Sequence, residues 1–361
     1  MPNLNLTALF RPEILAMSAY HVADAHNLIK LDAMENPYGW PADIQQAWLE
    51  HLKDCPMNRY PDPEAKALSE ALRASNNIPA ESGLLLGNGS DEIIQILQMA
   101  LPGNATVMAP EPGFVMYKQI ALSLGLRYQG VPLLADGFEL DLPAMLAAIE
   151  SSQPSLIFLA YPNNPTGNLF DAGAIREILA VAPGLVVVDE AYAPFADASF
   201  LGELPNYPNL LVMRTVSKLG LAGLRLGFLA GDNAILEQLH KVRLPYNINC
   251  LTQITAHFAL THQHFLLAQT RNICQQRGEI LAALQDMAGI ESYPSAANFI
   301  LLRTLAHAAD EVFISLKNQG VLIKNLSPQG GVLHNCLRVT IGKQEENRAF
   351  LAALRNALQN P

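Results

Sequence analysis

Lys218 is the residue whose type and position could do the most chemistry. It follows the apolar run 210–213 and lies in a glycine-rich segment that ends at Arg225. In such a setting, burial and a neighbouring cation lower the pKa of a lysine, which frees an amine for Schiff-base chemistry. The alternative is a solvated surface lysine, which is the commoner case for a lone lysine.

Asp189 directly follows a second apolar run, at 185–188. A carboxylate in that place is partly desolvated and needs a positive partner. A protonated pyridine nitrogen would supply one, and the charge would keep the ring an electron sink. A helix cap or a structural ion pair would explain the residue as well if it stood alone.

A third motif, Gly89-Ser90-Asp91, could bind an anion. Small residues there lead directly into a predicted helix, so free backbone N–H groups would point at one place. Ser217 and Arg225 could add a hydroxyl and a bidentate guanidinium to the same phosphate. An ordinary N-cap is the alternative interpretation.

A fourth feature is the pair formed by Asn164, which follows the apolar run 156–160, and Tyr192, which follows the same run as Asp189. Both side chains can hydrogen-bond a phenolate oxygen. The segment 163–167, Asn-Asn-Pro-Thr-Gly, is also a good turn sequence, and a turn alone would explain it.

These motifs need elements that bring them together, and the sequence predicts such elements. From about residue 64, helical stretches alternate with short apolar runs of strand length. The predicted helices cover 64–75, 91–101, 142–151, 234–244, 251–284 and 345–358, and the predicted strands cover 84–86, 105–109, 156–160, 185–188, 210–213 and 298–302. This alternation predicts a mostly parallel sheet covered by helices on both faces. Ligands bind beyond the carboxyl ends of such strands, which is where all four motifs lie.

The chain is long enough for more than one domain. We expect an N-terminal arm and part of a small domain in 1–40, a large ligand-binding domain in 41–250, and a linking helix with a small C-terminal α/β domain in 251–361.

The composition argues against several classes of partner. The chain has 361 residues and a net charge of −10 without a basic block, which argues against nucleic acid and anionic membranes. The four cysteines are scattered, so we expect neither a disulfide framework nor a metal site, and a reducing cytoplasm suits them. Residues 1–10 lack the pattern of a signal peptide, and no apolar stretch is long enough to span a bilayer.

Taken together, the motifs resemble those of the fold-type-I pyridoxal-phosphate-dependent aminotransferases. The resemblance extends from Asn36 to Gly342 and rests on the order of Gly-Ser-Asp, Asn-Pro-Thr-Gly, Asp-Glu-Ala-Tyr, Ser-Lys with a downstream Arg, and Leu-Arg-Val-Thr-Ile-Gly. Within this group the chain is most similar to the histidinol-phosphate aminotransferases, through the segments 36–39, 59–61, 217–225, 298–301 and 337–339. The resemblance implies a seven-stranded, mostly parallel sheet in the large domain, and pyridoxal 5'-phosphate as the cofactor.

The resemblance also implies a role for each site residue. Lys218 would bind the cofactor aldehyde covalently and move protons, Asp189 would pair with the pyridine nitrogen, and Tyr192 with Asn164 would bind the ring oxygen. Phe114 would stack on the ring, and Tyr60 would reach the cofactor phosphate from a partner subunit, which implies a homodimer. The remaining cofactor residues would contact the phosphate, namely Gly89, Ser90, Asp91, Thr215, Ser217 and Arg225. The substrate-side residues would be Tyr20, Asn36, Lys324 and Arg338, with Lys324 at a place where we expect an arginine.

The implied reaction is transamination between L-histidinol phosphate and 2-oxoglutarate, in histidine biosynthesis. An L-threonine-phosphate decarboxylase and an aromatic-amino-acid aminotransferase share these motifs, because substrate choice depends on a few loop residues. The effector-binding half of a transcription regulator would need an N-terminal helix-turn-helix module, whereas only some forty non-basic residues precede the motif pattern.

Overall fold

The computed structural model describes residues 4–19 and 23–359. The prediction for Tyr20 therefore lies outside the described residues. Within the described part of the chain, no helix is both long and apolar enough to cross a membrane.

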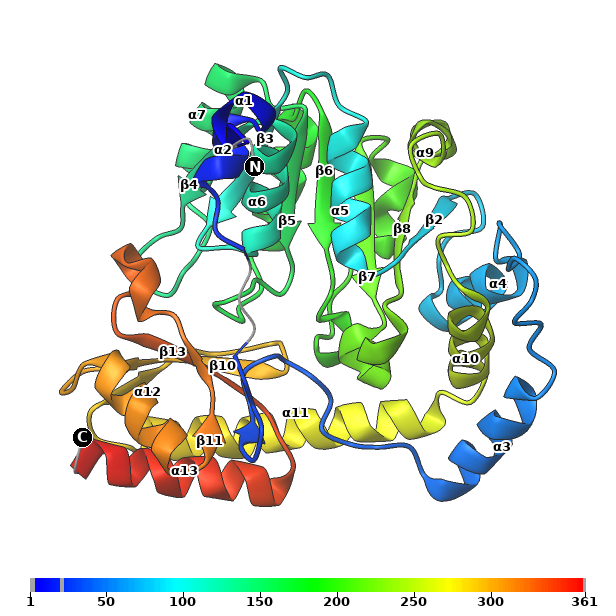
Figure 1. The fold of residues 1–361 in the computed structure, drawn as a ribbon. Coiled ribbons are helices and arrows are strands. Elements are labelled where there is room, and N and C mark those ends of the chain that lie inside the picture. Colours follow the sequence, from blue (N-terminus) through cyan, green and yellow to red (C-terminus); the bar gives the residue numbers. More distant parts are fainter. Residues whose placement is uncertain (1–3, 20–22, 360–361) are drawn as a thin grey trace.

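A seven-stranded sheet forms the centre of the larger part of the molecule (Figure 1). Its strands, in spatial order, are β2 (Gly83–Gly87), β8 (Gly227–Gly231), β7 (Leu210–Thr215), β6 (Leu185–Asp189), β5 (Leu156–Ala160), β3 (Thr106–Glu111) and β4 (Arg127–Pro132). Only β8 runs antiparallel to its neighbours. The prediction of an α/β fold with a mostly parallel, seven-stranded sheet is therefore confirmed.

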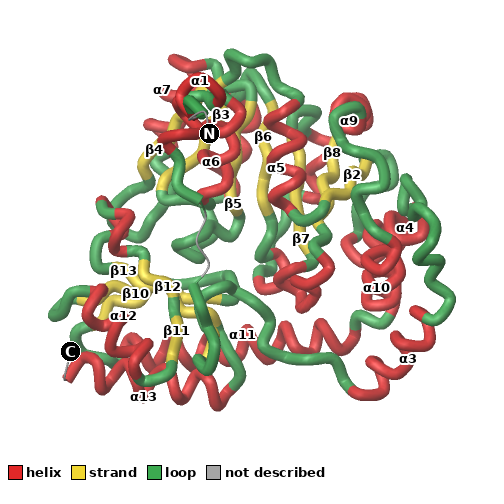
Figure 2. Tube along the Cα trace, viewed as in Figure 1, coloured by secondary structure: helices red, strands yellow, loops and turns green. Residues whose placement is uncertain are grey.

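The sheet is buried on both faces because helices cover each side of it (Figure 2). Alternate residues of β5 belong to different core clusters, with Ile157 facing one side and Phe158 the other. One face packs against α4 (Lys66–Asn76), α7 (Leu142–Ser152), α8 (Ala172–Val181) and α10 (Cys250–Thr261). The other packs against α5 (Ser90–Met99), α6 (Val115–Leu124) and α9 (Asn233–His240).

Strand β8 was not predicted from the sequence, because it begins and ends with glycine. The same glycines allow the strand to pack closely against its neighbours. Glycine has low strand propensity. A Cβ added at Gly227 would lie 2.9 Å from the backbone of Gly89, and one at Gly231 would lie 2.2 Å from Leu211. Gly227 therefore lets β8 fit closely against the turn that precedes α5, and Gly231 lets it fit against β7.

The C-terminal part builds a smaller α/β unit around a four-stranded sheet in the order β12-β13-β10-β9. Its elements are β9 (Ile290–Ser292), β10 (Phe299–Thr304), α12 (Ala309–Asn318), β11 (Val321–Leu322), β12 (Lys324–Asn325), β13 (Cys336–Thr340) and α13 (Gln344–Gln359). Strand β1 (Ile29–Lys30) pairs with β11, so an N-terminal segment joins this unit. The N-terminal segment also contains the helices α1 (Leu6–Leu9), α2 (Pro12–Ala16) and α3 (Ala42–Leu52).

The predicted helical stretch 251–284 is two helices rather than one. Helix α10 ends at Thr261, and α11 (His264–Gln285) begins after a break at His262 and Gln263. The ring of His262 stacks on Phe258 and bonds its carbonyl oxygen, which closes the end of α10. Helix α11 then runs along the base of the molecule and connects the side of α10 to the smaller unit (Figure 1).

Candidate active site

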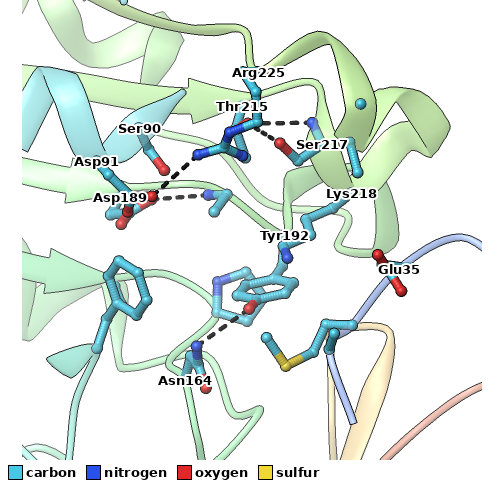
Figure 3. Close-up of a pocket in the computed structure, with 18 residues that line it drawn as sticks. Glu35, Ser90, Asp91, Asn164, Asp189, Tyr192, Thr215, Ser217, Lys218 and Arg225 are labelled. Carbon is cyan, nitrogen blue, oxygen red and sulfur yellow. Dashed lines mark hydrogen bonds and ion pairs between the residues drawn. The ribbon is translucent and has the colours of Figure 1, made fainter. Parts of the chain in front are cut away.

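One cavity of about 420 Å³ gathers most of the predicted site residues. In Figure 3 the side chains of Lys218, Asn164 and Arg225 surround one central space, which Asp189 closes on one side. The predicted residues that line the cavity are Ser90, Asp91, Phe114, Asn164, Asp189, Tyr192, Thr215, Ser217, Lys218 and Arg225. They come from different strand ends and their following loops, as expected for a parallel sheet.

Asp189 is the last residue of β6 and is buried. Its carboxylate accepts hydrogen bonds from the Tyr117 hydroxyl at 2.6 Å and from the Ala191 backbone N–H at 3.0 Å. Burial raises the pKa of Asp189 to about 6, and these two hydrogen bonds oppose the rise. Asp189 forms none of the ion pairs found among the described residues. A carboxylate that is buried and forms no such ion pair is suited to a cationic group of a ligand.

Lys218 lies at the start of the tight turn that follows β7. Its Nζ lies 5.7 Å from the centre of the Tyr192 ring. Burial lowers the pKa of Lys218 to about 8, and the positive charge of Arg338 contributes to the decrease. Roughly a tenth of the amine is therefore neutral at pH 7, far more than for an ordinary lysine, and the neutral form is the one that a nucleophile or a general base requires.

The N-terminus of α5 forms a cradle for an anion. Gly89 is the N-cap, with a φ of 84°, and Ser90 is the first helical residue. A Cβ on Gly89 would lie 2.6 Å from Arg225 Nη2, so only glycine lets the guanidinium approach the helix end. Arg225 donates to the Asp91 carboxylate at 3.1 Å, and the Thr215 and Ser217 hydroxyls bond each other at 2.9 Å. Backbone N–H groups, a helix dipole, hydroxyls and one guanidinium are the donors that suit a phosphate.

Asn164 connects the ring side of the cavity to the smaller unit. Its Nδ2 donates to the Tyr192 hydroxyl at 3.2 Å, and its Oδ1 accepts from Arg338 at 2.5 Å. Arg338 also donates to the Asp32 carbonyl at 3.1 Å and lies over the Phe299 ring. These contacts hold a largely buried guanidinium beside the cavity.

Lys324 lies directly opposite Arg338 on the neighbouring strand. Side chains of directly opposed residues project from the same face of a sheet and lie close together. Lys324 forms none of the ion pairs found among the described residues. Two neighbouring cations repel each other unless an anion lies between them, so this pair favours a dianionic group.

Five described residues of the predicted site do not line the cavity, namely Asn36, Tyr60, Gly89, Lys324 and Arg338, and Tyr20 lies outside the described residues. Asn36 donates to the Leu219 carbonyl and to the Gln269 side chain. These bonds connect the N-terminal segment to the turn that contains Lys218 and to α11. Tyr60 is 80% exposed and stacks on Tyr246 at 4.6 Å. The roles expected of Asn36, Tyr60 and Tyr20, like those of the residues that line the cavity, therefore stay predictions.

Two residues of the site were not found from the sequence. Tyr117 is fully buried in α6, and its ring stacks on Phe158 at 4.4 Å while its hydroxyl contacts Asp189. A tyrosine on the buried face of a helix, three residues after Phe114, was the available signal. The other is Glu35, which lines the cavity and forms an ion pair with Lys30 at 2.6 Å.

Comparison with known proteins identifies the family. A family model described as aminotransferase class I and II matches residues 26–354, and the chain belongs to this family. It is 56% identical to histidinol-phosphate aminotransferase 2 of Nitrosococcus oceani, with 97% of each chain covered. It is 49% identical to histidinol-phosphate aminotransferase of Chromobacterium violaceum, with 98% of each chain covered.

A solved structure has the same fold. The histidinol-phosphate aminotransferase from Sinorhizobium meliloti, in complex with pyridoxal-5'-phosphate, matches with a TM-score of 0.84 at 24% identity. The match covers 98% of this chain and 99% of that one.

The site fits pyridoxal 5'-phosphate, the cofactor of this family. The buried carboxylate of Asp189, which forms no ion pair within the described part of the chain, suits a protonated pyridine nitrogen. The α5 cradle suits the phosphate, and Lys218 offers an amine to the aldehyde. Phe114 lines the cavity and can cover one face of the ring.

Proposed function

We propose that this enzyme transfers the amino group of L-histidinol phosphate to 2-oxoglutarate, which gives imidazole acetol phosphate and L-glutamate. The observation that carries the substrate assignment is the Lys324–Arg338 pair, because two opposed cations, of which Arg338 bonds the cavity residue Asn164, suit a phosphorylated amine. The names of the curated relatives support the same substrate.

The chain's own residues divide the chemistry among them. The bound cofactor supplies an electron-withdrawing ring that stabilises negative charge on the substrate carbon. Lys218 Nζ would take the proton from the substrate carbon that bears the amino group and would deliver it to the cofactor carbon on the other side of the same nitrogen. Asp189 keeps a positive charge at the far end of the ring, and Tyr117 keeps Asp189 in place. Tyr192 and Asn164 orient the ring oxygen.

Arg338 and Lys324 orient the substrate through its anion. In the first half-reaction we assign them to the phosphate of L-histidinol phosphate, and in the second to a carboxylate of 2-oxoglutarate. A lysine at 324 keeps the charge but loses the planar fork of an arginine, so Arg338 would make the bidentate contact.

Glutamate formation by the purified enzyme tests the substrate. The donors are L-histidinol phosphate, L-phosphothreonine and L-phenylalanine, each with 2-oxoglutarate. We expect the highest kcat/KM with L-histidinol phosphate. Release of carbon dioxide from phosphothreonine, or preferred turnover of phenylalanine, would leave the cofactor chemistry intact and overturn the substrate assignment.

We further propose a homodimer in which Tyr60 completes the partner's site. The support is that Tyr60 is highly exposed and is held outward by its stacking on Tyr246. Mixing the inactive variants K218A and Y60A tests this, because a hybrid dimer contains one site with both native residues. Recovery of activity on mixing is expected, and its absence in a mixture shown to contain hybrids would contradict a shared site.

Two further proposals concern the domain boundaries and the location of the protein in the cell. We propose that residues 1–40, 41–250 and 251–361 are the domain boundaries, supported by the pairing of β1 with β11. We also propose a cytoplasmic location, which the four free cysteines support.

A further inference from the structure

Three sulfur atoms converge at a place that the transamination chemistry does not use. The thiols of Cys55 and Cys250 both donate to the thioether sulfur of Met57, each at 3.8 Å. Both cysteines are partly buried, whereas Met57 is 67% exposed. The pKa of the Cys55 thiol is raised by burial and by the neighbouring Cys250 thiol, so the two thiols also lie near each other.

Local structure fixes the position of each sulfur. The backbone N–H of Met57 bonds the Cys55 carbonyl at 2.9 Å, and this tight turn brings both side chains together across Pro56. Cys250 is the first residue of α10, whose N-cap Asn249 accepts from the Thr252 N–H. The three donors therefore come from a tight turn and from a capped helix end.

The distances match those around a small thiophilic metal ion. Metal–thiolate bonds of about 2.3 Å place neighbouring sulfur ligands about 3.8 to 4.0 Å apart, in tetrahedral or trigonal geometry. A thioether would have no function in a disulfide switch, but thiolates with a thioether select soft ions such as Cu(I). Structural zinc sites take four ligands from Cys, His, Asp and Glu side chains, and within the described residues no cluster of even three such side chains could hold a metal.

We propose that Cys55, Met57 and Cys250 form a binding site for a monovalent soft metal ion, with Cu(I) as the ligand. Binding exchanges protons without any electron transfer. One Cu(I) replaces the two thiol protons, the thioether adds its lone pair, and two protons leave to solvent. Affinity therefore rises with pH, because both thiols must be deprotonated in the complex.

Anaerobic titration of the holoenzyme with Cu(I), in competition with the chromogenic ligand bicinchoninate, tests the proposal. We expect one tightly held equivalent per chain, and a lower bicinchoninate signal as the pH rises. The variant M57L keeps both thiols and should lower the affinity about tenfold or more, since even the loss of a residue that supports a metal ligand has an effect of that size. C55S and C250S should lower it further.

The control is C274S, which removes a partly buried thiol that hydrogen-bonds the Phe195 carbonyl, away from Cys55 and Cys250 in the sequence. It should bind Cu(I) like the wild type. Transaminase activity and Tm without copper verify that every variant is folded. The proposal is overturned if the wild type holds no more Cu(I) than a C55S/C250S double variant. Wild-type affinity in M57L, or Zn(II) binding as tight as Cu(I), would overturn it as well.

Discussion

Replacing Tyr117 by Phe should weaken cofactor binding by changing the acidity of Asp189. The 2.6 Å hydrogen bond from Tyr117 stabilises the carboxylate form of a buried residue whose pKa is already raised to about 6. A hydrogen bond to a charged group contributes about 1.5–3 kcal/mol, and about 1.4 kcal/mol corresponds to one pH unit. The pKa of Asp189 in the Y117F apoprotein should therefore rise by about one to two pH units.

The cofactor dissociation constant, measured on apoprotein across pH, reports this change. Pairing with the pyridine nitrogen needs the charged carboxylate, so wild-type affinity should fall as the pH decreases through about 6. In Y117F the decline should begin about one to two units higher, so the affinity should be about 2- to 10-fold weaker near pH 7 and about 10- to 100-fold weaker near pH 5. The turnover number should fall together with the affinity, since the ring is less well held as an electron sink.

A matched control separates this effect from a loss of packing. Tyr128 also hydrogen-bonds a carboxylate, that of Glu111, but it lies on β4 outside the cavity wall. Y128F should leave the pH profile of cofactor binding unchanged. An unchanged profile in Y117F, or equal changes in both variants, would refute the role assigned to Tyr117.

Three further predictions concern the other charged groups. K218A should lose turnover and the visible absorbance of the covalently held cofactor, and a spectrum and activity like the wild type would remove its role. R338A should raise KM for L-histidinol phosphate about 30-fold or more, because it removes a buried charge that hydrogen-bonds Asn164 and the Asp32 carbonyl. K324A should raise KM by less, and steady-state kinetics of the two variants compares the effects. In the apoprotein, the raised pKa of Asp189 gives stability that is complete below pH 4 and is lost as the pH rises through about 6. D189N should therefore be more stable than the wild-type apoprotein at pH 8, by up to about 3 kcal/mol in urea unfolding, and equal stability there would contradict the assigned burial cost.

Much of the fold could be predicted because the local signals agree with the tertiary structure. The strand predicted at 156–160 is β5, since a continuous apolar run before a proline-rich turn is typical of a central strand. The cavity residues were found for a related reason. Parallel strands place their following loops at one edge, so the positions of Asp189 and Lys218 in the chain already determined that they meet.

What could not be predicted depends on contacts between distant segments. Tyr117 became part of the site only because α6 lies against the sheet face that holds Asp189. The opposition of Lys324 and Arg338 depends on a strand register that two residues of β12 do not reveal. The break after α10 contains neither glycine nor proline and is set by the packing of His262 on Phe258.

The two perturbed acid–base groups of the cavity have one physical consequence in common. Near neutral pH the apoprotein holds a charged carboxylate at Asp189 and a mostly protonated amine at Lys218, and burial disfavours both charges. A bound cofactor would relieve both, because Asp189 would face the positive charge of the pyridine nitrogen and Lys218 would be held in its neutral form. Part of the binding free energy would therefore come from removing the cost of these two buried charges. Cofactor binding should accordingly raise Tm in the wild type by more than in D189N, where one of the two buried charges is absent.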